Sequence, residues 1–226
     1  MQFKNRSDAG RQLAALLAGY RADPSVVVLA LPRGGVPVGA EVAAMLVAPL
    51  DVFVVRKLGV PGQEELAMGA IASGGIRVLN TSVLEGLRIP GDMVEAITQQ
   101  EQRELERRER TYRGDRPPLN LQDRTVILVD DGLATGSTMR AAVAAVRQLH
   151  PARIVVAVPT AAESTRDDLS RLVDAVVCVI TPEPFHAVGL WYEDFTQTSD
   201  DEIRPLLERA EGEWSDQHGP GNKERM

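Results

Sequence analysis

The stretch TVILVDDGLATGST, residues 125–138, decides the predicted fold. Residues 126–129 form a continuous apolar run, which is typical of a strand covered on both faces of a parallel sheet. Asp130 and Asp131 follow it, at the strand end where open α/β sheets place their ligands. The small and hydroxyl residues after them lead into a predicted helix, and the unpaired amides of a helix start bind phosphate groups. The stretch therefore predicts a site that combines two carboxylates with a phosphate-binding loop.

A simpler interpretation of the same stretch is a strand, a turn and a helix that aspartates cap. The complete pattern of residues 126–138 favours the ligand site, because its strand, carboxylates, loop and helix follow in the order that such a site needs. Two other phosphate motifs are excluded. No Gly-Lys-[Ser/Thr] follows the glycine spacing of a Walker loop, and no G-x-G-x-x-G occurs here.

The rest of the chain alternates strand-like apolar runs with helical periodicity. Strands are predicted over 25–32, 51–57, 125–131, 153–159 and 175–180, and helices over 7–20, 35–48, 92–113, 136–150 and 163–173. Residues 58–76 are rich in glycine without a clear period, and they are predicted to form a long loop or an irregular hairpin. This alternation predicts an α/β fold, with a central, mostly parallel sheet that helices flank.

The composition fits one large globular domain. The chain has 226 residues, of which 44% are hydrophobic and 25% charged, so it can bury a core without disulfides or a structural metal. Its single cysteine, Cys178, excludes a multi-cysteine metal site and is expected to pack in the core. We predict a domain over residues 1–210 and a polar, disordered tail over residues 211–226.

Charge and hydropathy exclude two classes of partner. A net charge of −7 argues against general nucleic-acid binding, which depends on a basic surface. No run reaches eighteen apolar residues, and the first twelve residues lack the apolar core of a signal peptide. We therefore expect no membrane partner and a cytoplasmic location.

The segment VDDGLATGST, residues 129–138, resembles the phosphoribosyl-pyrophosphate (PRPP) motif of the type I phosphoribosyltransferases, and it is especially similar to the version in the adenine enzyme. The resemblance implies that Asp130 and Asp131 hold the ribose 2- and 3-hydroxyls. It also implies that the 5-phosphate is wrapped by Ala134, Thr135, Gly136, Ser137 and Thr138. The 6-oxopurine enzymes carry an aspartate where Ala134 stands, so hypoxanthine and guanine are not the expected substrates.

Residues 31–36 (LPRGGV) resemble the pyrophosphate loop of the same family. The resemblance implies that Arg33, Gly34 and Gly35 face the departing diphosphate, beside a backbone amide that is often in a non-proline cis peptide. Glycine is needed there because a Cβ atom would block the close approach. Taken alone, Arg-Gly-Gly also fits a plain β-turn, and its position before the PRPP motif favours the loop.

Residues 55–61 (VRKLGVP) resemble the segment that opens the flexible catalytic loop in the adenine and orotate enzymes. On this resemblance Arg56 and Lys57 are catalytic residues that neutralise the charge developing on the diphosphate. The alternative is an ordinary strand end that reaches solvent. Glu64 or Glu65 in the following loop could assist proton transfer, although surface glutamates more often have no such role.

Residues 184–195 resemble the hood segment of the hypoxanthine-guanine enzymes, where an aromatic ring stacks on the base. Phe185 and Trp191 are the candidate contacts for a base or another acceptor, and packing onto the sheet explains their clustering equally well. His186 is expected to be structural. We expect a small hood formed by the C-terminal residues, with the N-terminal segment as a further candidate part.

The resemblance implies a Mg²⁺-dependent enzyme of nucleotide salvage that transfers phosphoribosyl from PRPP to a small acceptor and releases diphosphate. Mg²⁺ would take most of its ligands from substrate and water, with Asp130 and Asp131 reaching it through them. Family members are often dimers, so a homodimer is among the expected assemblies. A non-catalytic PRPP sensor is the alternative, and a sugar-phosphate hydrolase is a third. The acceptor and the role of the charged helix over 92–113 stay open.

Overall fold

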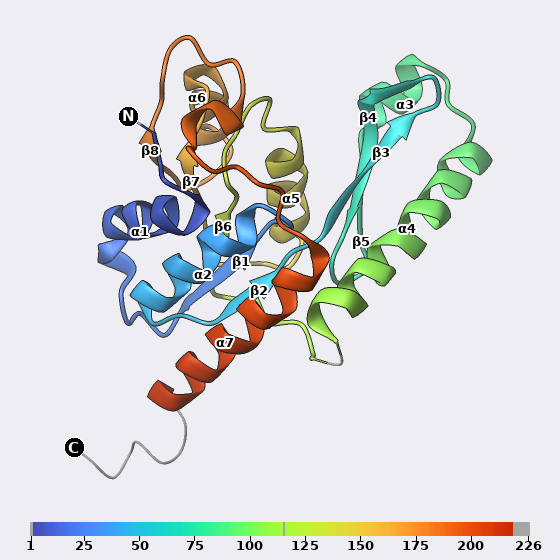
Figure 1. Cartoon of the computed structure of the whole chain (residues 1–226). Helices are drawn as coiled ribbons and strands as arrows, with labels where there is room; N and C mark the ends of the chain where they lie inside the picture. The colour runs from blue at the N-terminus through green and yellow to red at the C-terminus, as the bar shows by residue number, and fades with distance from the viewer. Residues whose placement is uncertain (1, 115, 219–226) are drawn as a thin grey trace.

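A parallel sheet forms the centre of the protein, whose computed structural model describes residues 2–114 and 116–218 (Figure 1). Its five strands lie in the order β2-β1-β6-β7-β8, and every neighbouring pair is parallel. The strands are β1 (Val26–Ala30), β2 (Leu50–Val52), β6 (Thr125–Val129), β7 (Arg153–Thr160) and β8 (Ala175–Ile180). The predicted α/β fold with a mostly parallel central sheet is confirmed.

Helices cover both faces of this sheet, because alternate residues of the buried strands point to opposite sides. Val28 and Ile127 belong to the apolar cluster that contains Leu13 and Val38, whereas Leu128 belongs to a second cluster with the opposite helices. The flanking helices are α1 (Arg6–Leu16), α2 (Gly35–Leu46), α5 (Ser137–Arg147), α6 (Glu163–Ser170) and α7 (Asp200–His218), with short 3₁₀ turns η1 (Ala18–Tyr20) and η2 (Val188–Trp191). Within the described ranges no helix is long and apolar enough to cross a membrane.

A second, antiparallel sheet corrects the predicted strand 51–57 and agrees with the irregular hairpin that was one of two predictions for residues 58–76. The predicted strand 51–57 is divided between β2 and β3 (Val55–Val60), and the segment after it contains β4 (Gln63–Ala72) and β5 (Ile76–Leu79), with register shifts between β3 and β4. These three strands form an arm with α3 (Thr81–Gly86) and the long helix α4 (Gly91–Arg113) (Figure 1). The arm folds because Leu58 and Met68 become buried in one cluster with Leu105 of α4.

The C-terminal part is a second correction. Helix α7 continues through residues 211–218, which were predicted to lie in a disordered tail, so the predicted boundary at residue 210 falls inside a helix. This helix has buried apolar side chains at helical spacing, namely Ile203, Leu207 and Ala210. They pack against the core and so stabilise the helix. The remainder of the predicted tail, 219–226, lies outside the described residues.

The two segments expected to form a hood lie side by side. Phe3 pairs with Tyr192 as a parallel β-bridge, and the Phe3 amide donates a hydrogen bond of 2.8 Å to the Trp191 carbonyl. Phe3, Ala9 and Tyr192 form a small buried cluster of their own. The N-terminal segment is therefore packed against the aromatic segment near residue 192, above the carboxyl ends of the strands.

Candidate functional site

The two motifs that the sequence placed on different strands meet at one edge of the sheet. Strands β1 and β6 are neighbours in register, with Ala30 opposite Val129, so the segments that follow them start side by side. A Cβ atom on Gly34 would lie 1.9 Å from Asp131 Oδ2, and one on Gly35 would lie 2.7 Å from the Val129 carbonyl oxygen. A side chain at either position would force the neighbouring atoms to move, because the loop backbone rests directly on the acidic pair. The Pro32–Arg33 peptide bond in this loop is cis.

The carboxylates of Asp130 and Asp131 are both largely removed from solvent. Burial raises the pKa of Asp130 well above its usual range, and the negative charge of Asp131 raises it further. Burial also raises the pKa of Asp131, while the Arg6 guanidinium beside it opposes that shift. Such a pair is stabilised by a cation or by hydroxyl donors, so a ribose diol or a metal-bound diol satisfies it.

Arg6 is a site residue that sequence reasoning missed. Its Nε donates to Asp131 Oδ2 at 2.8 Å, and its Nη1 donates to the Thr196 carbonyl at 2.7 Å. Its guanidinium carbon lies 4.0 Å from the centroid of the Phe195 ring. A single arginine near the start of the first helix gives no sequence signal, because its partners are 125 and 190 residues away along the chain.

The aromatic segment near residue 192 packs against the acidic pair and is hydrogen-bonded to its backbone. The Tyr192 hydroxyl donates to the Asp131 carbonyl oxygen at 2.6 Å, and the Tyr192 ring lies 5.0 Å from that of Phe195. Packing thus accounts for these two rings. Neither Phe185 nor Trp191 joins the ring contacts found among the described residues, and the Trp191 indole nitrogen is buried without a hydrogen-bond partner there. His186 is exposed.

The predicted phosphate loop runs from Ala134 to the start of α5. Gly136 has φ of 67°, a left-handed conformation that favours glycine, and helix α5 begins at the next residue. Thr165 of α6 donates its hydroxyl to the Ala134 carbonyl at 2.6 Å and fixes the loop from behind. Thr135 and Thr138 stay exposed, so the hydroxyls and the first amides of α5 can reach an anion.

Arg56 and Lys57 lie in strand β3, in agreement with the predicted strand over 51–57, and the residues after them continue as a hairpin. Arg56 forms an ion pair with Glu101 of α4, with Nη2 2.5 Å from Oε2. Strand alternation places Lys57 on the opposite face, together with Val55, which packs against the cluster that contains Met139 of α5. Glu64 and Glu65 belong to β4, and their side chains lie outside the described part of the structure.

A cavity of about 470 Å³ lies at the other end of the strands, beside the starts of β1 and β2 and against α7. Val26, Leu50 and Trp214 are among its lining residues, and none of the predicted site residues lines it. Among the described residues there is no group of three or more His, Cys, Asp or Glu placed to hold a metal.

Known proteins match this chain over most of its length. A family model described as the phosphoribosyl transferase domain matches residues 2–193. A protein of Mycobacterium tuberculosis that is provisionally named a phosphoribosyl transferase is 47% identical over 214 residues, which are 95% of this chain and 48% of that protein. The chain thus spans about half the length of the curated relatives that it matches.

Two further proteins are similar to this chain. The crystal structure of TT1426 from Thermus thermophilus superimposes with a TM-score of 0.82 and 41% identity, covering 92% of this chain and 98% of that one. A protein of Deinococcus radiodurans named bifunctional protein PyrR is 36% identical over 103 residues, which are 43% of this chain and 56% of that protein.

Proposed function

The chain belongs to the phosphoribosyl transferase family, and from this premise we propose that it binds PRPP with Mg²⁺ and transfers the phosphoribosyl group to a nucleobase or another small acceptor. The observation that supports the proposal most is the contact between the glycine loop and the acidic pair, where no atom separates Gly34 from Asp131. This contact brings carboxylates, a phosphate loop and the Arg33 loop to one edge of the sheet.

Each part of PRPP has a counterpart at this edge. The ribose hydroxyls are assigned to Asp130 and Asp131, and the 5-phosphate to the loop over residues 134–138 at the start of α5. The diphosphate is assigned to Arg33, Gly34 and Gly35. The dipole of α5 and its unpaired amides favour the phosphate dianion, although the whole protein is acidic.

In the proposed reaction the bond between the anomeric carbon and the diphosphate oxygen breaks, and its electron pair leaves with the diphosphate. The acceptor atom forms the new bond to the anomeric carbon and gives up its proton to solvent. The protein's share is to orient the two reactants and to stabilise charge on the leaving diphosphate. Lys57 and Arg56 are assigned to that charge stabilisation.

The residues present fit Mg²⁺ only as a shared ion. Mg²⁺ prefers oxygen ligands and keeps several waters, and the site offers two carboxylates. One oxygen of Asp131 is already held by Arg6. Asp130 and Asp131 would therefore reach the ion through ribose hydroxyls or water, and the bound ion would supply neutralisation of the diphosphate charge.

A PRPP-binding regulator is the second candidate, and one observation favours it. The segment expected to close over the substrate is a folded strand, and its Arg56 is already engaged by Glu101. A regulator needs binding without closure, whereas turnover needs the leaving group to be enclosed.

A screen for diphosphate release separates the two candidates. The chain is incubated with PRPP, Mg²⁺ and single nucleobases or small amines, and diphosphate is measured by a coupled assay. The enzyme proposal predicts acceptor-dependent release that Asp130→Asn abolishes. Tight PRPP binding without release for any acceptor in the panel would support the regulator, and absence of PRPP binding would refute both.

A further inference from the structure

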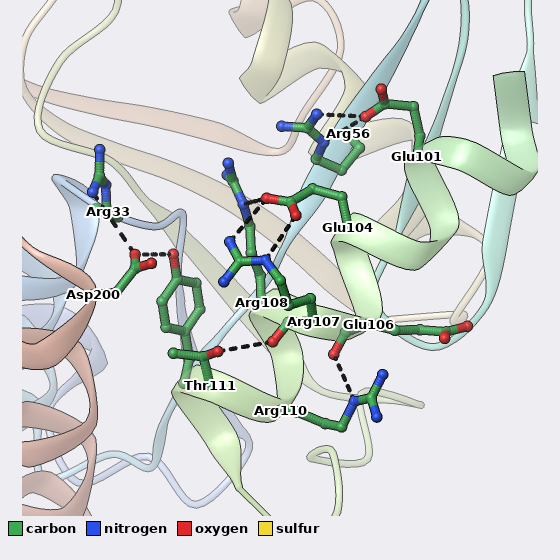
Figure 2. A network of polar contacts seen from close by, with 11 residues as sticks. Arg33, Arg56, Glu101, Glu104, Glu106, Arg107, Arg108, Arg110, Thr111 and Asp200 are labelled. Atoms are coloured by element: carbon green, nitrogen blue, oxygen red, sulfur yellow. Dashed lines mark hydrogen bonds and ion pairs between the residues drawn. The ribbon is translucent and has the colours of Figure 1, made fainter.

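Helix α4 presents one charged face toward the candidate site. Glu101, Glu104, Arg108 and Tyr112 recur at intervals of three or four residues, so they share a face of the helix. Figure 2 shows Glu101, Glu104 and Arg108 between Arg56 at one end and Arg33 at the other. The charge pattern alone assigns this helix no role.

Tyr112 connects this helix to the diphosphate loop through the first residue of α7. The Tyr112 hydroxyl donates to Asp200 Oδ1 at 2.7 Å, and the same oxygen lies 3.8 Å from Arg33 Nη1 (Figure 2). Tyr112 is only 1% exposed, while about a third of the Asp200 and Arg33 side chains is exposed. A buried phenol, a half-buried carboxylate and an outward guanidinium thus form one chain of contacts.

Burial determines which residue in this series of contacts is fixed and which residues it holds in place. The Tyr112 ring is packed in the core with Leu105, so its hydroxyl has a fixed position. Burial, together with the hydrogen bond to Asp200, raises the pKa of Tyr112 to about 12, so the phenol stays a donor at neutral pH. A carboxylate held by a fixed donor offers a fixed partner to the partly exposed guanidinium of Arg33.

Arg33 keeps donors for an anion in this arrangement. A guanidinium has five N–H donors in a planar fork, and the contact with Asp200 engages the Nη1 edge. Arg33 adjoins Gly34, which lies against Asp131. The orientation of the Arg33 fork therefore decides whether its other donors face the ligand edge of the sheet.

We propose that Tyr112 and Asp200 are positioning residues that hold the Arg33 guanidinium toward the diphosphate of PRPP, an inference that rests on the proposed function. At the other end of the same helix face, Glu101 forms an ion pair with Arg56 of β3, so the helix contacts Arg56 directly and Arg33 through Asp200.

The test compares two ligands that differ by the diphosphate. Affinities for PRPP and for ribose 5-phosphate are measured by calorimetry for the wild type, Tyr112→Phe and Asp200→Asn. Loss of the partly exposed ion pair that holds Arg33, whose atoms lie 3.8 Å apart, predicts PRPP binding weaker by about fivefold in each variant. Binding of ribose 5-phosphate should stay within about twofold, because its contacts are independent of Arg33.

Two controls make the result specific. The half-buried Tyr20, which packs in the same cluster, gives Tyr20→Phe as a matched loss of a phenol hydroxyl that should change neither affinity. The double variant Tyr112→Phe/Asp200→Asn should lose no more PRPP affinity than Asp200→Asn alone, since Tyr112 acts through Asp200.

The outcomes separate this proposal from the proposed function. Equal losses for both ligands would show a merely structural role for Tyr112, and unchanged PRPP affinity in Tyr112→Phe would also overturn the positioning role. A wild-type chain that binds ribose 5-phosphate but gains nothing from the diphosphate would overturn it as well. A wild-type chain that binds neither ligand would refute the proposed function itself.

Discussion

Replacing Gly34 with alanine tests the contact on which the site depends. Gly34 has φ of −62°, a backbone conformation that alanine adopts without strain, so the substitution changes only the space beside it. The added Cβ would lie 1.9 Å from Asp131 Oδ2 and 2.5 Å from its Cγ. The carboxylate must therefore move by more than about 1 Å to restore an ordinary contact. Arg6 holds the same oxygen at 2.8 Å, so the movement weakens this ion pair.

The expected magnitude follows from these distances. Overpacking of a filled site costs roughly 1–3 kcal/mol of unfolding free energy, and each kcal/mol lowers the melting temperature of a domain this size by about 2–4 °C. A displacement of about 1 Å at a positioning group costs on the order of 10²-fold in activity. Gly34→Ala should therefore melt several degrees lower and lose most of its PRPP affinity.

Thermal unfolding and calorimetry with PRPP measure the two effects. Gly212→Ala is the matched control, because a Cβ there meets nothing within 4 Å and alanine favours the helix α7. This control should melt no lower than the wild type. If Gly34→Ala has the melting temperature of the wild type and binds PRPP as tightly, the acidic pair is not packed against the loop, and the reasoning above is wrong.

Three further predictions address single side chains. Because burial raises the pKa of Asp130, the folded state loses stability as pH rises above about 4, the pKa of this carboxyl in the unfolded chain. The melting temperature of Asp130→Asn should therefore exceed that of the wild type at pH 7, and the difference should vanish below about pH 4. Equal melting temperatures at pH 7 would count against the raised pKa of Asp130. Burial raises the pKa of the Cys178 thiol to about 11, so an aromatic disulfide reagent at pH 8 should react about 10²-fold more slowly with the native chain than with the urea-unfolded chain; equal rates would contradict this. Lys57→Ala should lower kcat by about 10²–10³ while PRPP affinity falls much less, and Lys57→Arg should recover only part of the loss; unchanged turnover with the true acceptor would remove Lys57 from the mechanism.

The central sheet and the position of the loop between β6 and α5 could be predicted because their signals are local. Continuous apolar runs mark β1, β6 and β7, and the residues 130–138 that follow β6 are contiguous in the chain. The contact between Gly34 and Asp131 was not predicted, although each residue belongs to a motif that the sequence singled out. Its geometry needed the structure, since the register of β1 and β6 sets it.

The arm and the supports of the site could not be predicted, because their causes are long-range. Strand β4 has no clean alternation in its sequence, and it becomes a strand by burying Met68 against α4. Arg6 and Tyr192 reach Asp131 from opposite ends of the chain. The predicted helix over 92–113 was correct as α4, whereas its contacts with Asp200 and Arg56 were not predictable from its sequence.

Calorimetric titration of PRPP in the presence of Mg²⁺ tests most directly the central claim, that Asp130 and Asp131 hold PRPP at the carboxyl edge of the sheet. The wild type should give a saturable heat with one PRPP per chain. The variant Asp130→Asn/Asp131→Asn should give none, while its thermal unfolding shows a chain that is still folded. Wild-type affinity in that folded double variant would contradict the account.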